Sequence, residues 1–226
     1  MEAIILAGGL GTRLKGVIKD IPKPMAEIGD KPFLEYILKY LQKNDITRVI
    51  VSVGYKWQVI QDYFGDKFEN IDIVYSIENE LLGTGGAIKQ AMGKVKSNKV
   101  YILNGDTYFD IKLKLLKLKE DSKLAISLKE MVNFERYGCV KIDDKQYVKS
   151  FIEKKYTKIG NINGGVYLAR KSIFDDFILN DKFSFETFMQ DYIQNLRMNA
   201  KVFTSYFIDI GIPEDYKRAC IDLVKK

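Results

Sequence analysis

The sequence predicts an α/β fold, in which a mainly parallel mixed sheet carries helices on both faces to give three α/β/α layers. Two patterns predict it. In the first half of the chain, short β-branched runs alternate with amphipathic stretches, the order typical of parallel strands joined by crossover helices. From about Leu124 onward, strand-like runs follow one another at shorter spacing before helices return, which indicates further strands within the same sheet system.

The first half contains seven expected elements in alternating order. They are the strands 3–6, 48–53, 71–76 and 99–103, and the helices 32–41, 56–64 and one opened by Thr84-Gly85-Gly86. The second half adds four strands and two helices. These are the strands 124–129, 138–142, 147–152 and 162–169, and the helices that begin at Ser172 and Phe185.

A single domain over residues 1–226 is expected, because no Pro/Ser/Gly-rich linker, repeat or low-complexity tract interrupts the chain. No hexapeptide repeat is found, so no C-terminal β-helix domain is expected. The absence of a signal-peptide pattern and of a membrane-length apolar run indicates a soluble, cytoplasmic protein that does not bind membranes. The net charge of +6 is spread along the chain, which argues against nucleic-acid binding.

The chain contains no histidine. Ser-His-Asp hydrolysis, Cys-His proteolysis, histidine-ligated zinc and histidine general-base chemistry are therefore excluded. Any catalysis must use carboxylates, lysine and arginine, with or without a hard metal ion.

A glycine-rich loop follows the first expected strand and reads Leu6-Ala7-Gly8-Gly9-Leu10-Gly11-Thr12-Arg13-Leu14. Its glycines let the backbone approach a phosphate or a base, Thr12 can donate a hydrogen bond, and Arg13 can bind phosphate oxygens. The loop lacks the third glycine of the dinucleotide fingerprint, and no P-loop motif occurs in the chain. A plain chain turn is the alternative.

A stiffened lysine follows in Pro22-Lys23-Pro24-Met25. The two prolines restrict the segment and aim the ammonium group, so Lys23 is a candidate phosphate ligand. The alternative is a solvated lysine in a turn.

These motifs resemble the sugar-phosphate nucleotidyltransferases, whose signature reads G-G-x-G-T-R-L followed by P-K-P-[ML]. Later elements of that family match in order: Leu82-Gly83-Thr84-Gly85-Gly86-Ala87, Asn104-Gly105-Asp106, Glu153-Lys154, Asn163-Gly164-Gly165-Val166-Tyr167 and Asp209-Ile210-Gly211-Ile212-Pro213. The resemblance implies a Rossmann-like nucleotidyltransferase fold and one Mg²⁺. It also implies transfer of a nucleoside monophosphate to a sugar 1-phosphate with release of pyrophosphate, by a nucleotide-binding half (about 1–123) and a sugar-phosphate-binding half (about 124–226).

That chemistry suits the residue inventory, because a sugar 1-phosphate is already an anionic nucleophile and needs no general base. Asp106 follows the strand 99–103 and Asp209 follows the run 202–208, so both are expected at carboxyl strand ends. By resemblance, Asp106 and Asp209 bind Mg²⁺, and Arg13 and Lys23 complete the catalytic set. A turn aspartate at Asp106 and a helix cap at Asp209 stay as alternatives.

The resemblance also assigns the binding residues. The nucleotide set is Leu6, Ala7, Gly8, Gly9, Gly11, Thr12, Arg13, Lys23, Glu78, Gly83, Thr84 and Asp106. The sugar-phosphate set is Gly138, Glu153, Lys154 and Asn163. A surface Glu153–Lys154 pair and an Asn163-Gly164 turn are the plain alternatives.

Glu78 stands where several thymidine-selecting relatives place glutamine. A carboxylate only accepts hydrogen bonds, so it suits guanine, which presents two donors on one edge, and GTP is the expected nucleotide. Glu80 could be the base reader instead.

Within the family, the chain is most similar to short bacterial guanylyltransferases that act on D-glycero-D-manno-heptose 1-phosphate, whose product feeds surface glycans such as lipopolysaccharide and capsule. Mannose, glucose or N-acetylmuramic acid 1-phosphate nucleotidyltransferases are the enzyme alternatives. A catalytically silent nucleotide-binding subunit is another, although the joint presence of Arg13, Lys23, Asp106 and Asp209 argues against it. The sequence leaves both a monomer and a homo-oligomer open.

Overall fold

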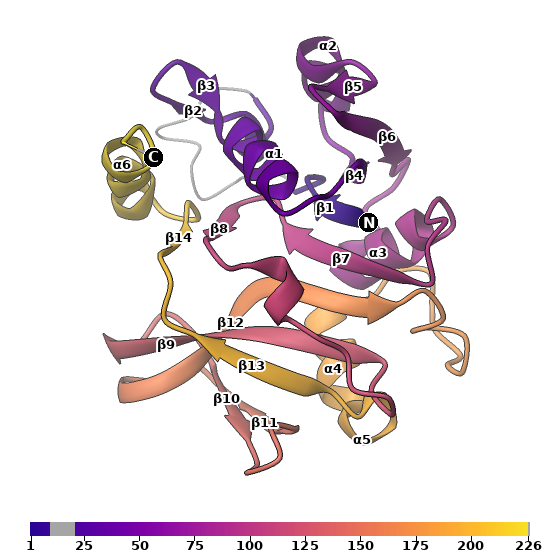
Figure 1. Cartoon of the computed structure of the whole chain (residues 1–226), viewed down its shortest axis with the longest axis vertical. Helices are drawn as coiled ribbons and strands as arrows, with labels where there is room; N and C mark the ends of the chain where they lie inside the picture. Colours follow the sequence, from indigo (N-terminus) through magenta and orange to yellow (C-terminus); the bar gives the residue numbers. More distant parts are fainter. Residues whose placement is uncertain (10–20, 226) are drawn as a thin grey trace.

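The computed structural model describes residues 1–9 and 21–225, and its main feature is a ten-stranded mixed sheet (Figure 1). The strands are β1 (Glu2–Leu6), β4 (Arg48–Val53), β5 (Lys67–Phe68), β6 (Ile71–Ile77), β7 (Lys99–Asn104), β9 (Leu124–Phe134), β10 (Cys139–Ile142), β11 (Val148–Ile152), β12 (Thr157–Arg170) and β13 (Asn199–Phe203). All run in one direction except β5, β11 and β12, as their pairings require. The sheet is mainly parallel, as expected.

The long strand β12 joins the two halves of the sheet. Its C-terminal part pairs with β7 of the parallel first half, and it also pairs with β9 and β10 of the second half. The parallel centre β7-β1-β4-β6 therefore continues without a break into the later strands. Both halves of the chain belong to one sheet system, as the sequence predicts.

Helices cover both faces of this sheet. They are α1 (Phe33–Lys43), α2 (Trp57–Phe64), α3 (Gly83–Met92), α4 (Phe185–Asp191), α5 (Ile193–Leu196) and α6 (Pro213–Asp222). Alternate strand residues sort between two buried clusters: Ile5 packs with the residues of α1 and α2, whereas Ile4 packs with those of α3 and α4. The three-layer α/β/α architecture is confirmed.

The helix α1 shows why the periodicity predicts the fold well. Its apolar residues recur at the spacing of one helical face, and all of them are buried. These residues are Phe33, Leu34, Ile37, Leu38 and Leu41. Pro32 precedes the helix as its N-cap residue, where its missing N–H removes no helical hydrogen bond.

The helix expected to begin at Ser172 is not formed, and this prediction is wrong. Residues 171–176 form successive turns, in which Asp175 N donates to Ser172 O at 3.2 Å and Phe177 N donates to Phe174 O at 3.1 Å. These hydrogen bonds span three residues rather than the four of an α-helix, so the segment forms turns. The helix expected at Phe185 is confirmed as α4.

Two short pairings lie outside the main sheet. β2 (Glu27–Ile28) pairs with β3 (Lys31–Pro32), and β8 (Thr107–Phe109) pairs with β14 (Phe207–Asp209), close to α6 in Figure 1. Two 3-10 turns, η2 (Lys23–Met25) and η3 (Leu113–Leu115), complete the described elements. Within the described ranges, no helix is both long enough and apolar enough to cross a membrane.

Candidate active site

A cleft of about 520 Å³ lies at the carboxyl ends of β1 and β7. This is the edge at which α/β sheets bind ligands, because their strand-to-helix turns present free backbone groups there. The cleft is lined by Leu6, Ala7, Gly8, Gly9, Lys23, Pro24, Glu78, Leu81, Gly83, Thr84, Ala87, Asn104, Gly105, Asp106 and Glu186. Most of the predicted nucleotide set therefore lies together. Gly11, Thr12 and Arg13 lie outside the described residues.

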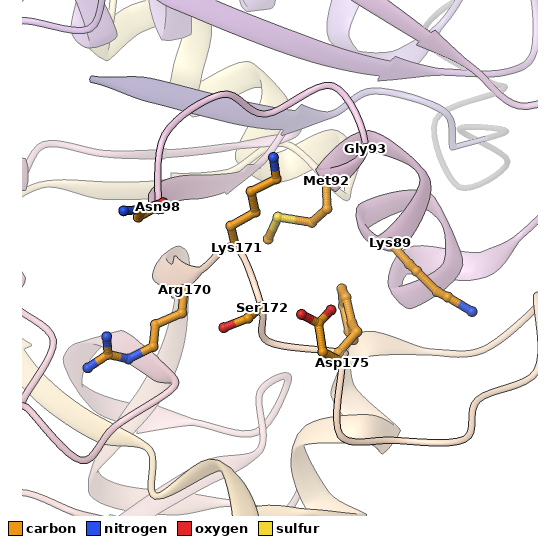
Figure 2. A pocket seen from close by; sticks show the side chains of 9 residues that line it. Lys89, Met92, Gly93, Asn98, Arg170, Lys171, Ser172 and Asp175 are labelled. Atoms are coloured by element: carbon orange, nitrogen blue, oxygen red, sulfur yellow. The ribbon is translucent and has the colours of Figure 1, made fainter.

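A second, larger hollow of about 730 Å³ lies at the opposite edge of the sheet (Figure 2). Asn98, which lines it, immediately precedes β7, and Arg170 pairs with Lys99 at the amino end of that strand. Figure 2 shows Lys89 and Arg170 extending to opposite sides of this hollow. None of the predicted site residues lines it, so the smaller cleft is the candidate active site.

Lys23 forms an ion pair with Asp106 inside the cleft, with 2.6 Å between Nζ and Oδ2. Lys23 begins η2, where Pro22 and Pro24 flank it and Met25 N donates to Pro22 O. Only 15% of its side chain is exposed, so this is not a freely solvated turn lysine. Asp106 is more open, with 37% of its side chain exposed.

Asp209 is brought next to Asp106 by the β8–β14 pairing. In that register Asp209 lies opposite Thr107, and Ile210 N donates to Asp106 O at 2.9 Å. The run 202–208 was expected to be one strand, and this is wrong: β13 ends at Phe203, and β14 begins at Phe207 in a separate two-stranded sheet. The break lets the chain leave the main sheet and pair with β8.

The Asp209 carboxylate is not a helix cap, since Ile212 occupies the N-cap position of α6. Its Oδ1 instead accepts a hydrogen bond from Gly211 N at 2.6 Å. Burial raises the pKa of Asp209, the neighbouring Asp106 carboxylate raises it further, and Lys23 partly opposes both effects. The two carboxylates thus repel each other across a small, partly buried space.

Such a pair suits Mg²⁺, which is commonly held by one or two carboxylates together with water and substrate phosphate oxygens. Among residues 1–9 and 21–225, no group of three or more histidine, cysteine, aspartate or glutamate side chains could hold a metal ion. Among these residues the protein would thus contribute two carboxylate ligands, Asp106 and Asp209, and phosphate and water would fill the remaining positions around the ion.

Glu78 closes the other end of the cleft, directly after β6. Its Oε2 accepts a hydrogen bond from Leu82 N at 3.2 Å, and its Oε1 accepts one from Ser52 Oγ at 3.4 Å. Burial raises the pKa of Glu78, although these two hydrogen bonds partly oppose the rise. A Cβ atom at Gly8 would lie 2.5 Å from Oε1, so the carboxylate occupies space that only a glycine leaves free.

The Gly83-Thr84 turn is fixed to α4. Gly83 has a φ of +71°, which favours glycine, and its added Cβ would lie 2.6 Å from Phe183 O. Thr84 Oγ1 donates to Glu186 Oε2 at 2.9 Å. Sequence reasoning missed Glu186, because it reaches the cleft only through the packing of α4 against α3 and belongs to no recognised motif.

The predicted sugar-phosphate residues do not line this cleft. Glu153 and Lys154 are exposed beyond the end of β11. A Cβ at Gly138 would lie 2.6 Å from Ile152 O, which places Gly138 beside the backbone that leads into Glu153. Asn163 makes internal contacts: Nδ2 donates to Tyr167 Oη at 2.7 Å, and Oδ1 accepts from Gly165 N at 3.0 Å. Asn163 and Gly164 lie within β12 and not in a turn between elements, and the bond to Gly165 N accompanies an irregularity in the pairing of β12 with β9.

Comparison with known proteins gives consistent matches. The family model described as Nucleotidyl transferase matches residues 2–226. D-glycero-alpha-D-manno-heptose 1-phosphate guanylyltransferase of Campylobacter jejuni is 59% identical, with 96% of this chain and 97% of that protein covered. The protein of the same name from Aneurinibacillus thermoaerophilus is 49% identical, with 97% and 96% covered.

Solved structures of related proteins match this chain over nearly its full length. HddC from Yersinia pseudotuberculosis is 44% identical, with a TM-score of 0.87 over 98% of this chain and 99% of that chain. A structure of the same HddC complexed with GMP-PN matches equally well. A putative glucose-1-phosphate thymidylyltransferase from Bacillus anthracis, 19% identical with a TM-score of 0.84 over 98% and 94% of the two chains, shares the fold.

Proposed function

This chain belongs to the nucleotidyl transferase family, and from that premise we propose that it transfers GMP from GTP to D-glycero-α-D-manno-heptose 1-phosphate. Pyrophosphate leaves, and the product is a GDP-heptose for surface glycan synthesis. The observation that carries the proposal is one cleft with an acceptor-only carboxylate, Glu78, at one end and the Lys23–Asp106 pair at the other. The names of the two heptose-specific relatives and the GMP-PN complex of HddC support it.

The reacting groups need charge compensation and alignment rather than a base. The sugar 1-phosphate oxygen attacks the α-phosphorus, the bond from that phosphorus to the β-phosphate bridging oxygen breaks, and pyrophosphate leaves. Lys23 supplies a fixed positive charge beside Asp106, and Arg13 is proposed as a second phosphate ligand from the family signature. Asp106 and Asp209 would hold Mg²⁺, which when bound supplies compensating charge to the phosphate oxygens.

Base selection is assigned to Glu78. Guanine presents N1–H and N2–H donors on one edge, and a carboxylate can accept both. Uracil and thymine present one donor between two acceptors, so they would place a carbonyl oxygen against the carboxylate. Glu78 already accepts hydrogen bonds from Leu82 N and Ser52 Oγ, and these hold its position before the base arrives.

The acceptor is proposed to bind next to the phosphate end of the cleft. The family pattern assigns its sugar hydroxyls to Gly138, Glu153 and Asn163 and its phosphate to Lys154. A Cβ built at Gly138 would lie 2.6 Å from Ile152 O, so Gly138 lies beside the backbone that leads into Glu153, which supports a shared location for Gly138 and Glu153.

The test is a matrix of GTP, ATP, UTP and dTTP against heptose, mannose, glucose and N-acetylmuramic acid 1-phosphates, with pyrophosphate release as the readout. We expect turnover to be highest with GTP and heptose 1-phosphate and to require Mg²⁺. Equal use of UTP or dTTP would overturn the assignment of the base, and a higher kcat/KM with mannose 1-phosphate would overturn that of the acceptor.

A further inference from the structure

Glu186 carries a carboxylate from the second half of the chain into the cleft. It lies in the first turn of α4, whereas every other described residue that lines the cleft falls between Leu6 and Asp106. Its Oε2 accepts hydrogen bonds from Thr84 Oγ1 and Ser184 Oγ, each at 2.9 Å. Within the described chain no donor reaches its Oε1, and the residue is exposed.

The position of this carboxylate is fixed by its neighbours. Thr84 Oγ1, which donates to Glu186, also accepts a hydrogen bond from Phe185 N at 2.9 Å. Ser184 is the N-cap of α4, and its Oγ accepts from Thr187 N at 3.2 Å. The Phe185 side chain is only 1% exposed. The first turn of α4 is therefore anchored on both sides, and Glu186 Oε1 is oriented before any ligand arrives.

The chemistry of an unused carboxylate oxygen limits what it can bind. A phosphate oxygen would be repelled by it, and Glu186 belongs to no group of three or more metal-ligating side chains in the described chain. No lysine or arginine among the described residues forms an ion pair with it. The N–H donors of guanine are already assigned to Glu78, so a hydroxyl group is the remaining partner among the groups of these substrates, because it donates a hydrogen bond and carries no charge.

We propose that Glu186 Oε1 accepts a hydrogen bond from a hydroxyl group of a substrate sugar ring, and that Glu186 is a substrate-positioning residue. The inference rests on the proposed function, since both GTP and a sugar 1-phosphate carry such hydroxyls. Its position beside Thr84, on a helix from the second half of the chain, places it in the cleft. The hydroxyl belongs either to the ribose or to the acceptor sugar, and the experiment separates the two.

The test is Glu186→Gln. The glutamine carbonyl can still accept from Thr84 and Ser184, but an NH₂ group replaces Oε1 and cannot accept a hydrogen bond. We expect kcat/KM to fall about ten- to a hundredfold for the substrate that carries the bound hydroxyl, the range for losing a hydrogen bond to a charged group. Glu120→Gln, an exposed glutamate remote from the cleft, is the matched control and should leave both KM values unchanged.

Deoxy analogues identify the hydroxyl. If the bound hydroxyl belongs to the ribose, the kcat/KM of wild-type protein should fall by about the same factor with 2′- or 3′-deoxyGTP. If it belongs to the acceptor sugar, kcat/KM should fall by that factor with a deoxy acceptor. For Glu186→Gln, kcat/KM should be no lower with that analogue than with the natural substrate. A merely structural role predicts a lower Tm and an equal loss of kcat/KM with every analogue.

The inference is overturned if Glu186→Gln matches wild type within twofold for both substrates, or if the variant discriminates against every deoxy analogue as strongly as wild type does. Failure of the proposed function looks different, because wild-type protein would then turn over no combination of GTP and sugar 1-phosphate. In that case calorimetry of GTP and its deoxy forms with Mg²⁺ decides the inference: equal affinities in wild type and Glu186→Gln overturn it.

Discussion

The Lys23 ammonium lies 2.6 Å from Asp106 Oδ2, and its charge also acts on Asp209, whose pKa it lowers. A Cβ built at Gly211 would lie 2.8 Å from Asp209 Oδ1 and 3.4 Å from Lys23 Nζ. One ammonium thus moderates the repulsion of two carboxylates in the unliganded protein. Because the pKa of Asp209 is raised despite this, the compensation is incomplete.

Asp209→Asn is therefore expected to raise the Tm of the metal-free protein at neutral pH while lowering turnover at least a hundredfold. The asparagine keeps the hydrogen bond from Gly211 N but removes a charge that burial and Asp106 disfavour. Thermal melts with and without MgCl₂ check the first part, and pyrophosphate release checks the second. Asp144→Asn, at an exposed aspartate, serves as the control. Unchanged Mg²⁺-dependent turnover in Asp209→Asn would refute the metal assignment.

The pH dependence follows from the same group. Since the pKa of Asp209 is raised, the native metal-free state binds this proton more tightly than the unfolded chain does. Its contribution to stability is then present below the unfolded pKa and is lost as pH rises through the folded pKa. Mg²⁺ binds the ionised form of Asp209. As the pH is lowered, turnover should therefore begin to fall at a pH above the pKa of an ordinary aspartate, which is about 3.9. Added Mg²⁺ should shift this acid limb to lower pH. Measuring kcat/KM against pH at two Mg²⁺ concentrations checks this; a limb insensitive to Mg²⁺ would contradict it.

Glu78→Gln tests base selection. Glutamine offers a donor beside an acceptor, so the variant should lose affinity for GTP about tenfold or more and gain relative activity with UTP or dTTP. Steady-state KM values for each nucleotide measure the change. Glu80→Gln provides a neighbouring control. A shift of preference in Glu80→Gln with none in Glu78→Gln would reassign the reader to Glu80.

Gly8→Ala should weaken GTP binding without unfolding the protein. The new methyl group would meet Glu78 Oε1 at 2.5 Å, and the far end of a side chain can move aside where backbone cannot. The cost should appear as a raised KM for GTP with a nearly unchanged Tm. Gly9→Ala is the stability control, because its Cβ would meet no described atom within 4 Å. A large drop in Tm for Gly8→Ala would show that the carboxylate cannot move.

Gly105→Ala should instead destabilise the whole fold. Its Cβ would lie 2.4 Å from Leu6 O, a backbone atom of the central strand β1, so β1 and β7 would have to separate at the cleft. Overpacking of this kind costs about 1–3 kcal/mol, measurable by urea unfolding. Gly93→Ala, whose nearest neighbour would be Gln90 O at 3.3 Å, is the milder comparison. Equal midpoints for the two variants would contradict this account.

Local patterns predict much of this fold and part of the site. The face of α1 is specified by apolar spacing alone, and Asp106 lies near the end of β7 because strands of a parallel sheet share one edge. Pairings between distant segments carry no such signal. Nothing local indicates that the run 202–208 breaks at Thr204, or that β14 then leaves the main sheet for β8. Glu186 escaped notice for the same reason, since its hydrogen bond to Thr84 spans 102 residues.

The β8–β14 pairing also sets an order of events during synthesis. Asp209 leaves the ribosome roughly a hundred residues after Asp106, a delay of about 5–20 s at typical translation rates. During that interval the growing chain already holds the cleft residues from Leu6 to Asp106, but it has only one of the two facing carboxylates. The second arrives when the last strand returns to β8. The two carboxylates can therefore face each other only after β14 has paired with β8, so the proposed Mg²⁺ site cannot form before the C-terminal part has folded back.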